Sequence, residues 1–117
     1  MDQLEISAGR GRSGARILRL RGVLTLLTLS DFQNTVRAET SALLIIDATD
    51  LQYMDSAGLG SLLGAFASCQ RNDRAFAVTG ASDRIQTLFR VTHVDTMLPT
   101  YASVEDAEAK CASAAGA

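Results

Sequence analysis

A carboxylate and a hydroxyl stand next to each other at Asp55-Ser56, between an apolar run and a stretch of small residues. This pattern predicts a strand that turns sharply into a helix. The first N–H groups of a helix lack partners and carry a partial positive charge. A serine there serves either as a helix cap or as a place where a phosphate group is well tolerated. Asp55 also has a capping side chain, so one of the two residues is not needed as a cap.

Small residues dominate the first turns of the helix expected from Ser56 to about Arg71. They are Ala57, Gly58, Gly60, Ser61 and Gly64. Each glycine costs a helix roughly 1 kcal/mol relative to alanine. Such a helix start is suited either to close approach by a binding partner or to close packing on the sheet of its own domain. The residues alone leave both explanations open.

An enzymatic role for Ser56 finds little support. Asp83 and His93 follow Ser56 in the chain order of a hydrolase triad, but the residue two before Ser56 is Met54, where a nucleophile elbow has glycine. So short a domain also leaves little room for a substrate pocket. The two cysteines, Cys69 and Cys111, fit no metal-binding spacing and are expected to be free thiols, with Cys111 in a polar tail. We predict no catalytic residue, no metal site and no cofactor.

The composition indicates one compact domain over residues 1–117, with a core at about 4–111 and a flexible tail at 112–117. The chain has 117 residues, 47% of them hydrophobic, and a net charge of −2. This charge does not favour nucleic acid as a partner. Five arginines between Arg10 and Arg21 are interpreted as a solvated strand face and loop. No apolar run is long enough to span a membrane and the first residues do not resemble a signal peptide, so we expect a cytoplasmic protein.

Strand and helix patterns alternate along most of the chain. Strands are expected at residues 4–7, 15–21, 43–48, 75–79 and 96–98, and helices after residues 28–31, 56, 82–83 and 103. Gly22 is predicted to end the second strand, and Pro99 to stop the last one. The order β–β–α–β–α–β–α–β–α predicts an α/β domain, with a mostly parallel four- to five-stranded sheet and βα crossover helices. Function in such sheets is found at the carboxyl ends of strands, where Asp55-Ser56 falls.

The run Ile45-Ile46-Asp47, followed by Met54-Asp55-Ser56-Ala57-Gly58-Leu59-Gly60, resembles the motif of STAS domains, and most of all that of bacterial anti-sigma factor antagonists. The resemblance covers nearly the whole chain. It implies a protein that, when unphosphorylated, binds an anti-sigma factor with serine kinase activity and so frees a sigma factor. It further implies that the kinase phosphorylates Ser56 and that a serine phosphatase removes the phosphate.

The resemblance also predicts a docking face for the kinase on both sides of this corner. Its residues are Gly22, Val23, Leu24, Thr25, Asp55, Ser56, Ala57, Gly58, Leu59, Gly60, Ser61 and Gly64. One position departs from the family pattern Gly-x-[Leu/Ile]-Asp, because Thr25 stands where the family usually has aspartate. This departure leaves an alternative role open, as a STAS scaffold subunit of a stressosome-like or lipid-transport complex.

Overall fold

The computed structural model describes residues 3–115, with side chains described to Cys111. Nine elements follow one another in the predicted order. They are β1 (Leu4–Arg10), β2 (Arg16–Leu24), α1 (Leu29–Arg37), β3 (Leu43–Met54), α2 (Ser56–Arg71), β4 (Ala75–Thr79), α3 (Asp83–Val91), β5 (Thr100–Tyr101) and α4 (Val104–Ala115). The predicted bounds of α2 and β4 agree with the structure.

The five strands form one sheet in the order β1-β2-β3-β4-β5. β1 and β2 form an antiparallel hairpin, and each later strand pairs in parallel with the one before it. A helix precedes β3, β4 and β5, as parallel neighbours require crossover connections. The predicted fold class is therefore confirmed.

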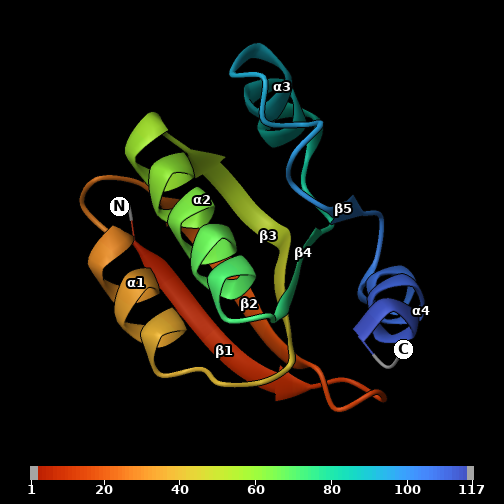
Figure 1. Cartoon of the computed structure of the whole chain (residues 1–117). Coiled ribbons are helices and arrows are strands. Elements are labelled where there is room, and N and C mark those ends of the chain that lie inside the picture. Colours follow the sequence, from red (N-terminus) through yellow and green to blue (C-terminus); the bar gives the residue numbers. More distant parts are fainter. Residues whose placement is uncertain (1–2, 116–117) are drawn as a thin grey trace.

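Helices cover the two faces of this sheet unequally, as Figure 1 shows. α1, α2 and α3 pack on one face over the larger hydrophobic core, which includes Phe32, Leu62 and Phe89. α4 covers part of the other face through Ala107 and Cys111. Successive strand residues serve opposite faces, so Ile17 joins the α4 side and Leu18 the larger core.

Gly22 does not end the second strand, contrary to the prediction. β2 continues through it to Leu24, and the register against β3 shifts on both sides of Gly22. Its φ of 107° lies where side chains are strained, and a Cβ atom there would collide with the carbonyl oxygen of Gln3. The glycine lies within the strand rather than at its end. The extra residues of the irregular pairing are on β3, where Ala48 and Thr49 face Leu20 alone. β3 lengthens to Met54 because it pairs with this extension of β2.

The last strand lies later in the chain than the sequence predicts. Residues 96–98 form a turn in which the Met97 and Leu98 N–H groups donate to the Val94 carbonyl, and β5 lies beyond Pro99 at Thr100–Tyr101. Proline lacks an N–H group but keeps its carbonyl, which accepts from Val78 N–H at 2.9 Å. Pro99 therefore leads into the strand instead of stopping it.

Cys111 lies deeper in the fold than predicted. Cys111 is buried on α4, whereas the sequence placed it in a polar tail. It contacts the Tyr101 hydroxyl at 3.7 Å. α4 extends to Ala115, into the segment predicted as a flexible tail, and residues 1–2 and 116–117 lie outside the described residues. Cys69 and Cys111 are free thiols, as predicted.

Candidate functional site

Asp55, and not Ser56, is the N-cap of α2. Its backbone is extended, and one carboxylate oxygen accepts a hydrogen bond from the Gly58 N–H at 2.7 Å. The other oxygen accepts from the Leu26 N–H at 3.1 Å. One side chain thus satisfies a free donor of the helix start and fastens the loop between β2 and α1 to it. The carboxylate is the structural member of the pair.

Ser56 is the first residue of α2 and is exposed to solvent. Since Asp55 supplies the cap, the serine hydroxyl is not needed for it. It lies where N–H groups point outward and the helix dipole favours negative charge. The geometry therefore matches an accessible hydroxyl that can carry an anionic group.

The glycines of α2 serve different purposes. Gly58 is buried, and a Cβ atom on it would collide with the backbone carbonyl of Leu24 at the end of β2. At Gly60 and Gly64 a Cβ atom would have no neighbour within 4 Å, and both residues are exposed. Close packing inside the domain explains the first glycine only. The other two glycines leave a stretch of the α2 surface without side chains.

The loop that joins β2 to α1 presents two leucines beside this corner. Leu26 is 69% exposed and Leu27 84% exposed, which makes them the most exposed large apolar side chains in the described part of the chain. Thr28 holds the loop from below, because its hydroxyl donates to the Val23 carbonyl at 3.0 Å and accepts from the Thr25 N–H at 2.9 Å. Sequence reasoning missed both leucines. Their signal was an apolar pair that fits neither strand nor helix periodicity.

Thr25 begins this loop, at the position where the chain departs from the family pattern. It is half-buried, and its hydroxyl oxygen accepts from the Leu27 N–H at 3.3 Å. Its carbonyl accepts from the N–H groups of Thr28 and Leu29. Thr25 therefore shapes the turn that carries the exposed leucines, without adding a charge.

The predicted docking residues lie at the ends of β2 and β3 and along the first half of α2, at different depths. Ser56, Gly60 and Gly64 are exposed, whereas Gly22, Thr25, Asp55 and Ala57 are half-buried. Val23, Leu24, Gly58, Leu59 and Ser61 are buried. The first two groups are accessible at the surface, and the buried residues lie beneath it.

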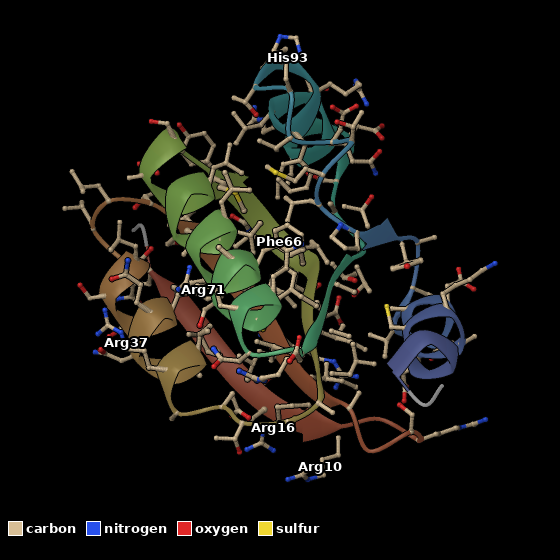
Figure 2. The ribbon with its side chains drawn as sticks, viewed as in Figure 1. Arg10, Arg16, Arg37, Phe66, Arg71 and His93 are labelled. Carbon is tan, nitrogen blue, oxygen red and sulfur yellow. The ribbon has the colours of Figure 1, made fainter. Side chains whose placement is uncertain are left out.

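The residues of the hydrolase alternative are not assembled. Asp83 begins α3, and His93 lies two residues beyond its end. A helix rises about 1.5 Å per residue, so α3 holds these side chains apart. Figure 2 shows His93 at the tip of the α3 region. Burial raises the pKa of the Cys69 thiol, although Arg74 opposes this effect, so that thiol is held in its unreactive form. No cluster of metal-ligating side chains occurs among the described residues.

The arginines near the hairpin have individual roles. Arg16 pairs with Glu39 at 3.0 Å, and Arg19 with Asp47 at 3.3 Å across neighbouring strands. The Arg19 side chain is 60% exposed, which fits the expected solvated strand face.

Residues 9–107 match the STAS domain family, and this match covers most of the chain. The chain therefore belongs to the STAS domain family. Among characterised proteins it is similar to the anti-sigma-B factor antagonist of Listeria monocytogenes, with 40% identity over 53 residues. That alignment covers 45% of this chain and 46% of the Listeria protein, so the matched segment spans about half the length of this relative.

Solved structures show the same fold. An anti-sigma factor antagonist from Mycobacterium paratuberculosis superposes with a TM-score of 0.82 over 92% of each chain, at 17% identity. The phosphorylated form of the Bacillus cell fate determinant SpoIIAA superposes with a TM-score of 0.70, at 16% identity, over 92% of this chain and 99% of SpoIIAA. Within the described residues, every helix is too short or too polar to cross a membrane.

Proposed function

We propose that this chain is an anti-sigma factor antagonist controlled by phosphorylation of Ser56. In its unphosphorylated form it binds an anti-sigma factor that is a serine kinase, and it thereby frees a sigma factor. One observation carries the proposal: Asp55 caps α2, which leaves Ser56 exposed at the helix start. The antagonists to which the chain is similar supply the class of partner.

Phosphorylation at Ser56 alters binding more than it alters folding. A phosphoserine adds about −1.5 to −2 charges at neutral pH. The N–H groups and dipole of α2 accommodate that charge within the domain. A partner that packs on Ser56 must instead desolvate the phosphate and the Asp55 carboxylate beside it. A loss of about 2.7 kcal/mol in binding would lower affinity a hundredfold.

The exposed leucines complete the proposed docking face. Leu26 and Leu27 lie on the loop that Asp55 fastens to the start of α2. Exposed apolar side chains next to a polar switch give a partner area to bury, while Ser56 decides whether it can approach. We propose that Thr25 keeps this loop in shape through hydrogen bonds and that phosphorylation does not require a carboxylate at position 25.

Co-purification with candidate kinase anti-sigma factors, followed by phosphosite mapping, tests the proposal. We expect a stable complex without ATP, modification of Ser56 when ATP is added, and release that a serine phosphatase reverses. Ser56→Asp should weaken binding at least tenfold. Ser82→Asp is the matched control, because it adds a carboxylate at another exposed helix start and should leave binding unchanged.

Three outcomes would contradict this function. Phosphate on a residue other than Ser56, or wild-type binding by the Ser56→Asp variant, would eliminate the switch. A stable hetero-oligomer that never releases in ATP would instead favour the scaffold role in a stressosome-like or lipid-transport complex.

A further inference from the structure

A groove of about 750 Å³ runs between α1 and α2, which lie side by side in Figure 1. Phe32, Val36 and Ala65 line it with buried apolar side chains. The wall contributed by α2 consists of small residues. They are Ala57, Gly60, Ser61, Gly64 and Ser68. The volume is in the range of protein sites that hold a small ligand, about 300–1,000 Å³.

One end of the groove adjoins the phosphorylation site proposed above. Ala57 follows Ser56 directly, and Gly60 lies one helical turn further on. Gly60 and Gly64 are exposed, and space is open above both. The groove is therefore continuous with the proposed docking face, and its α2 wall lets another backbone approach closely.

The other end of the groove is strongly basic. Arg37 is in the last turn of α1 and Arg71 in the last turn of α2, and Figure 2 shows both at this end of the helix pair. Arg74 follows α2 and also lines the groove. Its Nε donates to the Ser41 carbonyl at 2.6 Å, while its Nη2 is buried and has no hydrogen-bond partner among the described residues.

Among the described residues, none of Arg37, Arg71 and Arg74 forms a salt bridge. Glu39 is the one carboxylate among the lining residues, and both its oxygens accept from Arg16 Nε at 3.0 Å. Arg37 reaches only the amide oxygen of Asn34, at 3.5 Å. Arginines suit the ends of helices because of the dipole, but that role leaves their guanidinium groups free to bind anions.

We propose that this groove binds an acidic polypeptide segment of the anti-sigma factor, an inference that rests on the proposed function. Small and apolar side chains of the segment pack against α2 and Phe32, and its carboxylates pair with Arg37 and Arg71. Guanidinium groups bind carboxylates through two parallel hydrogen bonds, which fixes orientation as well as charge. Gly60 and Arg71 are about 16 Å apart along α2, from a rise of about 1.5 Å per residue, so a short segment spans the groove.

This occupant also explains why a phosphate at Ser56 would be effective. The acidic segment must pass the mouth of the groove beside Ser56. Charges interact there within the screening length of about 8 Å at physiological ionic strength. Arg71 lies about 22 Å from Ser56 along α2, beyond this length, so the phosphate acts on the part of the segment at the mouth of the groove and not on the carboxylates that the arginines hold.

The test uses the 117-residue chain and the purified kinase identified by co-purification. We expect the double variant Arg37→Glu/Arg71→Glu to bind at least tenfold more weakly in calorimetric titration. Arg90→Glu is the matched control, because Arg90 is in the last turn of α3 and does not line the groove. It should bind as the wild type does. Circular dichroism and thermal unfolding of each variant separate loss of binding from loss of folding.

A photo-crosslinking residue at position 64 identifies the occupant directly. We expect it to capture a kinase segment that contains Asp or Glu, and we expect Lys substitutions in that segment to restore binding to the double variant. A captured segment without carboxylates, or wild-type affinity of a folded double variant, would overturn the groove proposal.

Failure of this inference is distinguishable from failure of the proposed function. If Ser56→Asp releases the kinase while the double variant binds normally, the groove proposal fails and the phosphorylation switch stands. If the double variant is weakened while Ser56→Asp binds normally, the switch fails and the groove stands. A chain that binds no kinase overturns both.

Discussion

The helix starts of α2 and α3 use the same two residue types in opposite order. In α2 the cap is Asp55 and the first helical residue is Ser56, whereas in α3 the cap is Ser82 and the first helical residue is Asp83. The Ser82 hydroxyl accepts from the Ile85 N–H at 3.3 Å, so that serine is committed to its helix. The Ser56 hydroxyl does not cap its helix and forms no hydrogen bond within the described residues. Reversing the order of the pair thus separates a structural serine from one that is available for modification.

The two starts also differ in what lies beneath them. The third helical residue of α2 is Gly58, pressed against the Leu24 carbonyl, whereas α3 has the core residue Ile85 at the same position. Asp55 reaches the loop at Leu26 as well as its own helix. The start of α2 is therefore tied to a second segment through both its cap and its packing, and α3 begins more independently.

Gly58→Ala should lower the stability most, because α2 packs too closely on β2 at this position to accept a side chain. The new Cβ atom would overlap the Leu24 carbonyl, which is backbone and cannot move aside. We expect a loss of about 1–3 kcal/mol or more in the free energy of unfolding, measured by urea denaturation. Gly60→Ala, with open space at its Cβ, should instead gain up to about 1 kcal/mol. Equal stabilities of the Gly58→Ala and Gly60→Ala variants would show that α2 does not pack closely on β2.

Asp55→Ala should cause the second-largest loss of stability. It removes the acceptor for the Gly58 and Leu26 N–H groups, so we expect a loss of about 1–2 kcal/mol. Hydrogen exchange should accelerate at both amides. Asp55→Asn keeps one acceptor oxygen and should retain part of the stability. Unchanged protection at Leu26 would mean that the loop is held without the carboxylate.

The order of elements and the identity of the corner could be predicted from the sequence, because both rest on local patterns. Apolar periodicity located α2, and capping residues located the start of α3. The assignment of the cap could not be predicted, because Asp55 and Ser56 both satisfy the preference and a shift of one residue exchanges their roles. The contacts of Gly58 with Leu24 and of Asp55 with Leu26 determine which of the two residues is the cap.

Longer-range features were beyond local patterns. β3 extends to Met54 through Thr49 and Asp50, whose polarity hides the strand. This part of β3 is a strand because it pairs with the end of β2, in a register that shifts on both sides of Gly22. The basic end of the groove joins Arg37 to Arg71, which are far apart in the sequence. Only the packing of α1 beside α2 brings these residues together.

The same serine-to-alanine substitution at the starts of α2 and α3 compares the structural roles of Ser56 and Ser82 directly. Ser82→Ala removes a cap and should lower the free energy of unfolding by about 1 kcal/mol. Ser56→Ala removes an exposed hydroxyl that does not cap the helix and should change it by less than about 0.5 kcal/mol. Thermal and urea unfolding measure both. A cost at Ser56 as large as that at Ser82 would mean that the Ser56 hydroxyl is structural.

A third pairing of serine and carboxylate is expected to have a small effect that depends on pH. Glu108 on α4 accepts from the Ser13 hydroxyl at 2.7 Å and from the Ser13 N–H at 2.8 Å, which joins α4 to the β1–β2 hairpin. These bonds lower the pKa of the Glu108 carboxyl from its ordinary value of 4.5, mainly through the hydroxyl. Here the serine and the acid bond each other, unlike at either helix start.

A lowered pKa means that the folded state favours the ionised carboxylate. Its stabilising effect is complete above the ordinary pKa of 4.5 and is lost as the pH falls through the lower value in the folded protein. Glu108→Gln should therefore cost less than about 1 kcal/mol at pH 7, because the carboxylate is partly exposed, and the cost should vanish in acid. Unfolding curves from pH 7 to 3 measure this, with Glu105→Gln on the same helix as control. If both variants lose stability equally at every pH, the Ser13 bonds do not hold α4 to the hairpin.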